Sequence, residues 1–359
     1  MRAVLAALPA YLPGRNVPGS IKLASNETAY GPLPHVLDRI TAAAAEANRY
    51  PDTNSSELLR ALASKFGVGV EHLVVGCGSV SLCQQLVQAT AGHGDEVVFG
   101  WRSFEAYPII TAIGGAQAVQ VPLREQAHDL PAMAAAVTDR TRLIFVCNPN
   151  NPTGTAVPGV QLTEFLDQVP ADVLVVLDEA YREFVTDEKV QDGTGLLDRY
   201  PNIIVLRTFS KAYGLAGLRI GYGLAADPAV ATAVRQTQVP FAVTHVAQAA
   251  ALASLEPEAE RQLADRVAEV VTERARVTGA LRTVGYQLPD SEANFVWLAD
   301  GPLDQGGVDA VAFGAGCEAR GVVVRVFAGS GVRITVGTAA ENDKFLSAAV
   351  ELRGQQPAD

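Results

Sequence analysis

Lys211 stands in a short, glycine-punctuated segment beside groups that could bind a phosphate. The apolar run 202–206 predicts a strand, so the lysine should emerge at a strand's carboxyl end, where open α/β sheets bind their ligands. Thr208, Ser210 and Arg219 add two hydroxyls and a guanidinium, which suit a phosphate ester. An amine able to form a Schiff base beside such groups indicates pyridoxal 5'-phosphate. The alternative interpretation is a solvated surface lysine in a loop.

Two further segments place polar side chains where strands should end. The buried-type run 173–177 leads into Asp178, and Tyr181 follows close enough to face the same cleft. Asn151 lies in the turn NPNNPTG, 148–154, after another apolar run. The aspartate is either a helix cap or a functional charge. The asparagine either reaches into a cleft or bonds only its own backbone.

Polar groups at four other positions have both a functional and a structural interpretation. Ser79 ends the run GCGS, 76–79, before an amphipathic helix whose N–H groups and dipole could take a phosphate, although any tight strand-to-helix turn favours the same residues. Tyr50 is a loop aromatic, functional or simply packed on the surface. Arg325 and Arg333 lie in otherwise apolar strands, where a guanidinium needs an anionic partner unless the position is an exposed edge.

The composition argues against several classes of protein. The chain has 359 residues, 48% of them hydrophobic and 19% charged, which suits an ordered enzyme of two domains. A net charge of −11 without a basic stripe argues against a nucleic-acid partner. No window approaches a membrane span, and Pro9 and Pro13 interrupt the apolar N-terminus, so we expect a cytoplasmic protein without a membrane partner. Scattered cysteines and histidines imply no metal.

Strands and helices alternate from residue 73, which predicts an α/β fold with a mostly parallel central sheet covered on both faces. Residues 1–32 form an extended arm in this interpretation. Further strands and helices near the carboxyl end predict a second, smaller domain. The expected strands are 73–75, 96–99, 118–121, 142–147, 173–177, 203–206 and 219–223 in the large sheet, and 294–298, 322–327 and 332–337 in the small domain.

Taken together and in this order, the motifs resemble the fold type I pyridoxal phosphate aminotransferases, and within them the histidinol-phosphate aminotransferase branch. The match spans nearly the whole chain. It rests on KLASNETAYGP (22–32), RYPD (49–52), GCGS (76–79), NPNNPTG (148–154), DEAY (178–181), RTFSKAYGLAGLRIGY (207–222), ANFVW (293–297) and VRITVGT (332–338). The segments GCGSVSLCQQLVQ and VVFGWRSFEAYP look most like the actinobacterial aromatic amino acid (phenylalanine) aminotransferases of this branch.

The resemblance implies a role for each matching residue. Lys211 would hold the cofactor as a Schiff base and shuttle a proton, and Asp178 would pair with the pyridine nitrogen. Asn151 and Tyr181 would hydrogen-bond the ring hydroxyl, and Phe104 would stack on the ring. The phosphate would be held by Ser79, Val80, Thr208, Ser210 and Arg219, joined by Tyr50 from the partner subunit of a homodimer. The substrate would be held by Arg333, which grips its carboxylate, and by Arg325, Asn26 and Tyr30.

The resemblance also implies a domain organisation and a reaction. Residues 1–45 would be the N-terminal arm and part of the small domain, 46–270 the large cofactor-binding domain, and 271–359 the small C-terminal domain. The reaction would be reversible, ping-pong transfer of the amino group of phenylalanine, tyrosine or tryptophan to 2-oxoglutarate. The implied partners are therefore small amino acids and 2-oxo acids.

Two departures from the histidinol-phosphate pattern bear on the substrate. Val80 and Ser81 stand where that branch usually carries an acidic pair, and Arg325 is followed by a short loop, VFAGSG, that alters the mouth of the site. Arg325 would then serve the carboxylate of the second substrate instead of a phosphate. Histidinol-phosphate transamination is the nearest alternative. A catalytically silent binding or regulatory protein on this fold is a remote one.

Overall fold

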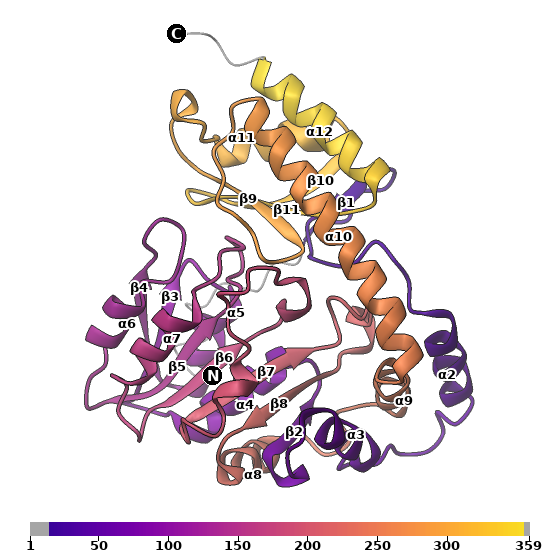
Figure 1. Ribbon diagram of the computed structural model, residues 1–359, viewed down its shortest axis with the longest axis vertical. Coiled ribbons are helices and arrows are strands. Elements are labelled where there is room, and N and C mark those ends of the chain that lie inside the picture. Colours follow the sequence, from indigo (N-terminus) through magenta and orange to yellow (C-terminus); the bar gives the residue numbers. More distant parts are fainter. Residues whose placement is uncertain (1–13, 355–359) are drawn as a thin grey trace.

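The computed structural model describes residues 14–354, which form two sheets with helices around them (Figure 1). The larger sheet has seven strands in the order β2-β8-β7-β6-β5-β3-β4. Strands β3 to β7 are parallel, whereas β8 is antiparallel to β2 and β7. The predicted α/β class with a mostly parallel central sheet is thus confirmed. The strands are β2 Leu73–Gly76, β3 Glu96–Trp101, β4 Gln117–Pro122, β5 Thr141–Cys147, β6 Leu174–Asp178, β7 Ile203–Thr208 and β8 Gly221–Ala225.

Alternate residues of the central strands point to opposite faces of this sheet, and each face has its own helices. Val97 and Phe99 belong to the core beneath α4, α5 and α8, whereas Val98 belongs to the core beneath α6 and α7. Both faces of the sheet are therefore buried, which explains why the sequences of the strands are continuous apolar runs. The helices are α4 Ser79–Thr90, α5 Ala106–Gly114, α6 Leu130–Ala135, α7 Gly159–Leu166 and α8 Pro228–Thr237.

The smaller sheet has four strands in the order β1-β10-β11-β9 and packs on α11, α12 and the end of the long helix α10 (Pro257–Thr283). The arm supplies β1, which pairs in parallel with β10. This pairing joins segments from the two ends of the described chain. The elements are β1 Ile21–Leu23, β9 Phe295–Ala299, β10 Val322–Phe327, β11 Gly331–Thr335, α11 Ala310–Ala319 and α12 Ala339–Gly354.

Helix α10, Pro257–Thr283, runs from beside α2 and α9 to the small sheet (Figure 1). Its Leu263 packs in the core shared with α2, α3 and α9, whereas Leu281 packs in the core of the small sheet. The helix is continuous through residue 270, and the expected division into 1–45, 46–270 and 271–359 stays a prediction. The three helices of the first core are α2 Pro34–Ala44, α3 Ser56–Phe66 and α9 His245–Ser254.

One expected strand begins two residues later than its sequence suggested. The run 219–223 was expected to be extended, but β8 starts at Gly221 because Arg219 has the left-handed backbone angle φ 56° at the end of a short turn. Among residues 14–354, none of the helices has the length and apolar character needed to cross a membrane. The remaining helical turns are Val70–His72, Arg182–Phe184, Gly193–Leu196, Ala216–Leu218 and Leu303–Gln305.

Candidate active site

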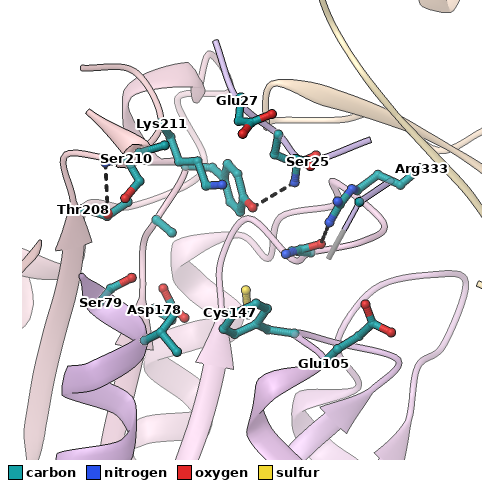
Figure 2. A pocket seen from close by; sticks show the side chains of 18 of the residues that line it. Ser25, Glu27, Ser79, Glu105, Cys147, Asp178, Thr208, Ser210, Lys211 and Arg333 are labelled. Atoms are coloured by element: carbon teal, nitrogen blue, oxygen red, sulfur yellow. Dashed lines mark hydrogen bonds between the residues drawn. The ribbon is translucent and has the colours of Figure 1, made fainter. Parts of the chain in front are cut away.

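A pocket of about 380 Å³ lies where β5, β6 and β7 end, and their last residues Cys147, Asp178 and Thr208 line it. The arm and the small sheet supply the opposite wall (Figure 2). Most of the predicted site residues line this pocket, namely Asn26, Ser79, Val80, Phe104, Asn151, Asp178, Tyr181, Thr208, Ser210, Lys211, Arg219, Arg325 and Arg333. Segments from the whole length of the chain therefore meet at one cavity.

Lys211 projects into the pocket from the loop that follows β7. The loop is tight, because Gly214 donates its N–H to the Lys211 carbonyl at 3.1 Å and has a left-handed φ of 71°. Burial is the main cause that lowers the pKa of the Lys211 amine from 10.5 to about 7; the positive charges of Arg333 and Arg219 contribute to this net shift, and the charges of Glu27 and Asp178 oppose it. A large share of this amine is thus neutral, and nucleophilic, near neutral pH.

Asp178 lies buried below Lys211 and lines the pocket, and only one of its two carboxylate oxygens is hydrogen-bonded to a side chain (Figure 2). Tyr107 of α5 donates its hydroxyl to Oδ2 at 2.6 Å, while Oδ1 has no hydrogen-bond partner among the described residues. Burial raises the pKa of Asp178, and the bond from Tyr107 opposes that rise. The orphaned Oδ1 is suited to accept a hydrogen bond from a cationic N–H donor in the pocket.

Tyr107 itself was not among the residues predicted from the sequence. Its ring is fully buried and stacks on Phe145, with centroids 4.4 Å apart and planes at 10°. Phe104, which was predicted, lines the pocket and contacts the Tyr107 ring edge-on at 5.5 Å. A tyrosine on a helix reads as a core residue, and nothing local in the sequence pairs it with an aspartate 71 positions away.

Separate hydrogen bonds join the arm to the large sheet, and the small sheet to both, around the pocket (Figure 2). Asn26 donates its amide to the Tyr181 hydroxyl at 2.9 Å. Arg333 donates to Asn151 Oδ1 at 2.5 Å and to the carbonyl of Ala24 at 2.9 Å. The Asn151 oxygen is occupied in this way, so its Nδ2 group is the donor that this side chain can offer a ligand.

Four groups form an anion cradle at one end of the pocket, which we define as Ser79, Thr208, Ser210 and Arg219. Ser79 begins α4, whose first N–H groups and dipole favour an anion. Arg219 donates to Ser210 Oγ at 3.3 Å and is exposed over much of its length. Gly78 precedes the helix with φ 77° and ψ 158°, a backbone conformation that favours glycine, and its lack of a side chain leaves room for Arg219 Nη2 close by.

Tyr50 and Tyr30 are not among the residues that line this pocket. Tyr50 is 83% exposed and stacks on Phe241 with ring centroids 4.6 Å apart. Tyr30 donates its hydroxyl to Glu269 of α10 at 2.7 Å. The role of Tyr50 in a partner's site and that of Tyr30 in substrate binding stay predictions.

Glu105 is a second pocket residue that sequence reasoning missed. It directly precedes α5, and its Oε2 accepts a hydrogen bond from Arg325 Nη2 at 2.7 Å. The two residues are 220 positions apart, so only the folded chain reveals the pair. The anionic partner that the sequence required for Arg325 is therefore this glutamate.

The arrangement as a whole defines an α/β transferase site. It has a reactive lysine, a buried carboxylate and an anion cradle at the carboxyl ends of neighbouring strands. Across the described residues there is no group of His, Cys, Asp and Glu side chains that could hold a metal ion. The chemistry of this donor set is that of an amine and an oxyanion-binding end, not of metal ligands.

The chain belongs to the class I and II aminotransferases, because the model of that family matches residues 18–348. It is 56% identical to an aromatic amino acid aminotransferase of Streptomyces coelicolor over 98% of this chain and 97% of the relative. It is 57% identical to an aromatic amino acid aminotransferase of Thermobifida fusca over 97% of this chain and 96% of the relative. A histidinol-phosphate aminotransferase of Sinorhizobium meliloti, solved in complex with pyridoxal-5'-phosphate, aligns with TM-score 0.87 at 29% identity, covering 99% and 97% of the two chains.

Proposed function

We propose that this protein is a pyridoxal phosphate-dependent aromatic amino acid aminotransferase, which moves the amino group of phenylalanine, tyrosine or tryptophan reversibly to 2-oxoglutarate in a ping-pong cycle. The observation that carries the proposal is the placement of the Lys211 amine above the unpaired Oδ1 of Asp178 in one pocket. The aromatic substrate class is supported by relatives of that name at 54–57% identity over nearly the full chain.

The residues present fit the proposed cofactor. Asp178 Oδ1 can accept from a protonated pyridine nitrogen, the anion cradle suits a phosphate ester, and Phe104 lies where a ring could stack. Gly78 gives Arg219 access to the cradle. Pyridoxal phosphate supplies, when bound, an aldehyde that reacts with amines and a ring that withdraws electrons from the substrate's α-carbon.

The chain's own groups would orient the substrate and move its proton. Arg333 presents a guanidinium for the α-carboxylate, and its bonds to Asn151 and Ala24 hold it in place. Lys211 Nζ has a pKa of about 7, so its neutral and protonated forms are both populated near neutral pH. It could therefore take a proton from the substrate's α-carbon and give it to the cofactor carbon. Tyr181 and Asn151 would orient the cofactor ring through their hydroxyl and amide groups.

Histidinol-phosphate transamination is the alternative, and one specific observation supports it. Arg325 lies at the pocket, where a guanidinium could bind a substrate phosphate, and the Sinorhizobium meliloti relative bears that name. The Glu105 carboxylate on Arg325 disfavours it, because a phosphate dianion brought there would meet a like charge.

The deciding experiment is a comparison of donors with 2-oxoglutarate as the acceptor. We expect kcat/KM for phenylalanine, tyrosine or tryptophan to exceed that for histidinol phosphate by at least about tenfold, a difference near 1.4 kcal/mol in transition-state binding. A reversed order would assign the protein to histidinol-phosphate transamination. Absence of turnover with every donor would favour a binding or regulatory protein.

We also propose that the protein is a homodimer in which Tyr50 completes the partner's anion cradle. An exposed apolar patch of Tyr50, Val239 and Phe241 supports this, since such side chains gather at interfaces. Sedimentation at micromolar concentration checks the dimer, and a loss of pyridoxal phosphate affinity in Tyr50→Ala checks the contribution across the interface. A cytoplasmic location likewise stays a prediction.

A further inference from the structure

Two arginines stand side by side on the wall that the small sheet presents to the pocket. Arg325 of β10 and Arg333 of β11 are directly opposite in the antiparallel register, so their side chains leave the same face of the sheet. Both line the pocket. Like charges placed opposite each other destabilise a sheet unless acceptors are close to them. The two arginines are therefore expected to recruit acceptors.

The acceptors around the two arginines differ in charge. Arg333 donates to the uncharged oxygens of Asn151 and Ala24. Arg325 donates to the carboxylate of Glu105, which points into the pocket from the side of the large sheet (Figure 2). An anionic ligand that approached Arg325 would have to compete with that carboxylate.

The Glu105 side chain is placed so that it can exchange partners. It makes no capping bond to α5, although it directly precedes the helix. Its Oε1 lies 3.8 Å from Nη1 of Arg102, whose own Nε is held by Ser330. Glu105 and Arg325 keep side-chain exposures of 29% and 15%, so water reaches this pair and an exchange of partners costs less than it would for a fully buried pair. Arg102 is thus a second cation with which the Glu105 carboxylate can pair.

We propose that Glu105 is a built-in counter-ion that sets substrate selectivity at Arg325. It neutralises Arg325 when the bound substrate has an uncharged aromatic side chain, and yields Arg325 to the distal carboxylate of a dicarboxylic acceptor by turning to Arg102. It also repels a phosphate dianion, which carries more charge at the same place. The proposal rests on the proposed function, because only a cycle that alternates aromatic and dicarboxylic substrates needs such an exchange.

The test is equilibrium binding to the holoenzyme, with succinate as an unreactive dicarboxylate and inorganic phosphate as the dianion. Glu105→Gln keeps the size of the side chain and an oxygen for Arg325 but removes the charge. By titration calorimetry in phosphate-free buffer, we expect the dissociation constants of succinate and phosphate to fall about tenfold. KM for phenylalanine should change less than about threefold.

Two further variants isolate the pair. Glu27→Gln removes another carboxylate that lines the same pocket but pairs with Lys22, and it should change the succinate constant by less than about twofold. In an Arg325→Gln background, Glu105→Gln should have no further effect on succinate. Unchanged or weaker succinate binding in Glu105→Gln would overturn the inference, as would an equal response of Glu27→Gln.

These outcomes separate the inference from the function on which it rests. Normal transamination of phenylalanine with no response to Glu105→Gln would refute the counter-ion alone. Tighter succinate binding in a protein that transaminates no aromatic donor would refute the proposed function and, with it, the exchange between substrates. The calorimetric signal itself requires no turnover.

Discussion

Two arginine–glutamate pairs lie at the pocket. We call Arg207 and Glu179 the floor pair, because they adjoin Thr208 and Asp178 at the strand ends. We call Arg325 and Glu105 the mouth pair, because both line the pocket. Beneath the floor, Arg207 of β7 donates twice to Glu179 Oε2, at 2.9 and 2.6 Å, with side-chain exposures of 8% and 3%. At the mouth, Arg325 and Glu105 share a bond of 2.7 Å, but their exposures are 15% and 29%. The two pairs have the same chemistry and similar distances, and they differ in access to water.

The difference in burial gives the two pairs different roles. Glu179 also accepts from Gly193 N–H at 2.7 Å, and Arg207 also donates to Asp192 at 2.7 Å, so the floor pair is held by further hydrogen bonds on β7, the strand whose following loop carries Lys211. A buried charge that loses its partner is costly, whereas a partly exposed pair contributes little to stability. The floor is therefore suited to positioning the chemistry, and the mouth to choosing substrates.

The largest effect on turnover is expected from Lys211→Ala, in the loop that follows the strand of the floor pair. Removing the amine removes the proton carrier, which alone accounts for roughly 10²–10⁴-fold in rate. Steady-state assays with phenylalanine and 2-oxoglutarate should therefore show turnover near the detection limit. Lys22→Ala, which removes a lysine paired with Glu27 near the same pocket, is the matched control. Retained turnover in Lys211→Ala would end the assignment of the site.

Burial in the pocket, with the nearby charge of Arg333, should also control the protonation of Lys211. With a pKa of about 7 instead of 10.5, the reactive neutral amine increases as pH rises through 7. Pulse acylation of the apoprotein, read by mass spectrometry of the Lys211 peptide, should show a midpoint near that pH. The same peptide in urea-unfolded protein should show a midpoint near the ordinary value. Equal midpoints in the two states would mean that the pocket does not perturb the amine.

Breaking the floor pair should destabilise the fold strongly. Arg207→Met keeps much of the side-chain volume but leaves the Glu179 carboxylate buried without its cation, and burial already raises the pKa of that group. We expect the free energy of unfolding to fall by about 3–5 kcal/mol. Urea unfolding of the apoprotein measures this loss. A loss below about 1 kcal/mol would mean that the floor pair contributes as little to stability as we expect of the mouth pair.

A smaller effect is expected from Tyr107→Phe, which removes one hydrogen bond and preserves the ring stack. A hydrogen bond to a charged group is worth about 1.5–3 kcal/mol, so pyridoxal phosphate should bind roughly tenfold to a hundredfold more weakly. The pKa of Asp178 should rise further, so the loss should grow as pH falls and the carboxylate protonates. Tyr286→Phe, which removes a buried bond to Ala349 in the small-sheet core, should leave cofactor affinity unchanged.

The smallest effect on stability is expected at the mouth. Glu105→Gln should change the free energy of unfolding by less than about 1 kcal/mol, because both partners are partly exposed. The same urea titration as for Arg207→Met gives the direct comparison. A loss as large as that of Arg207→Met would show that the mouth pair is structural, and its role in selectivity would then need another explanation.

The residues at the strand ends beside the floor pair could be predicted from the sequence far better than the partners in the mouth pair. Apolar runs of the length of buried strands end at Asp178 and just before Thr208 and Lys211, and the carboxyl ends of parallel strands meet at one edge of a sheet. Each of these residues could therefore be placed without knowing any long-range contact. Arg325 and Arg333 stood out as charges in otherwise apolar strands, and the resemblance to a family supplied their roles toward a substrate.

The partners of those residues could not be predicted, because they depend on pairing between distant segments. Tyr107 meets Asp178 across 71 positions, and Glu105 meets Arg325 across 220. The parallel pairing of β1 with β10 likewise joins segments about 300 positions apart, with Ile21 opposite Val322. Arg219 was expected in a strand because the apolar pattern gives no sign of its left-handed backbone.

The most direct test of the account is a half-reaction without an acceptor. Phenylalanine is added to the purified holoenzyme, and the visible absorbance of the bound cofactor is followed together with the phenylpyruvate formed. The account predicts loss of the yellow colour with about one phenylpyruvate per site, at far lower concentration than with histidinol phosphate, and no such change in Lys211→Ala. A colourless protein, or a yellow one that does not respond to aromatic amino acids, would contradict it.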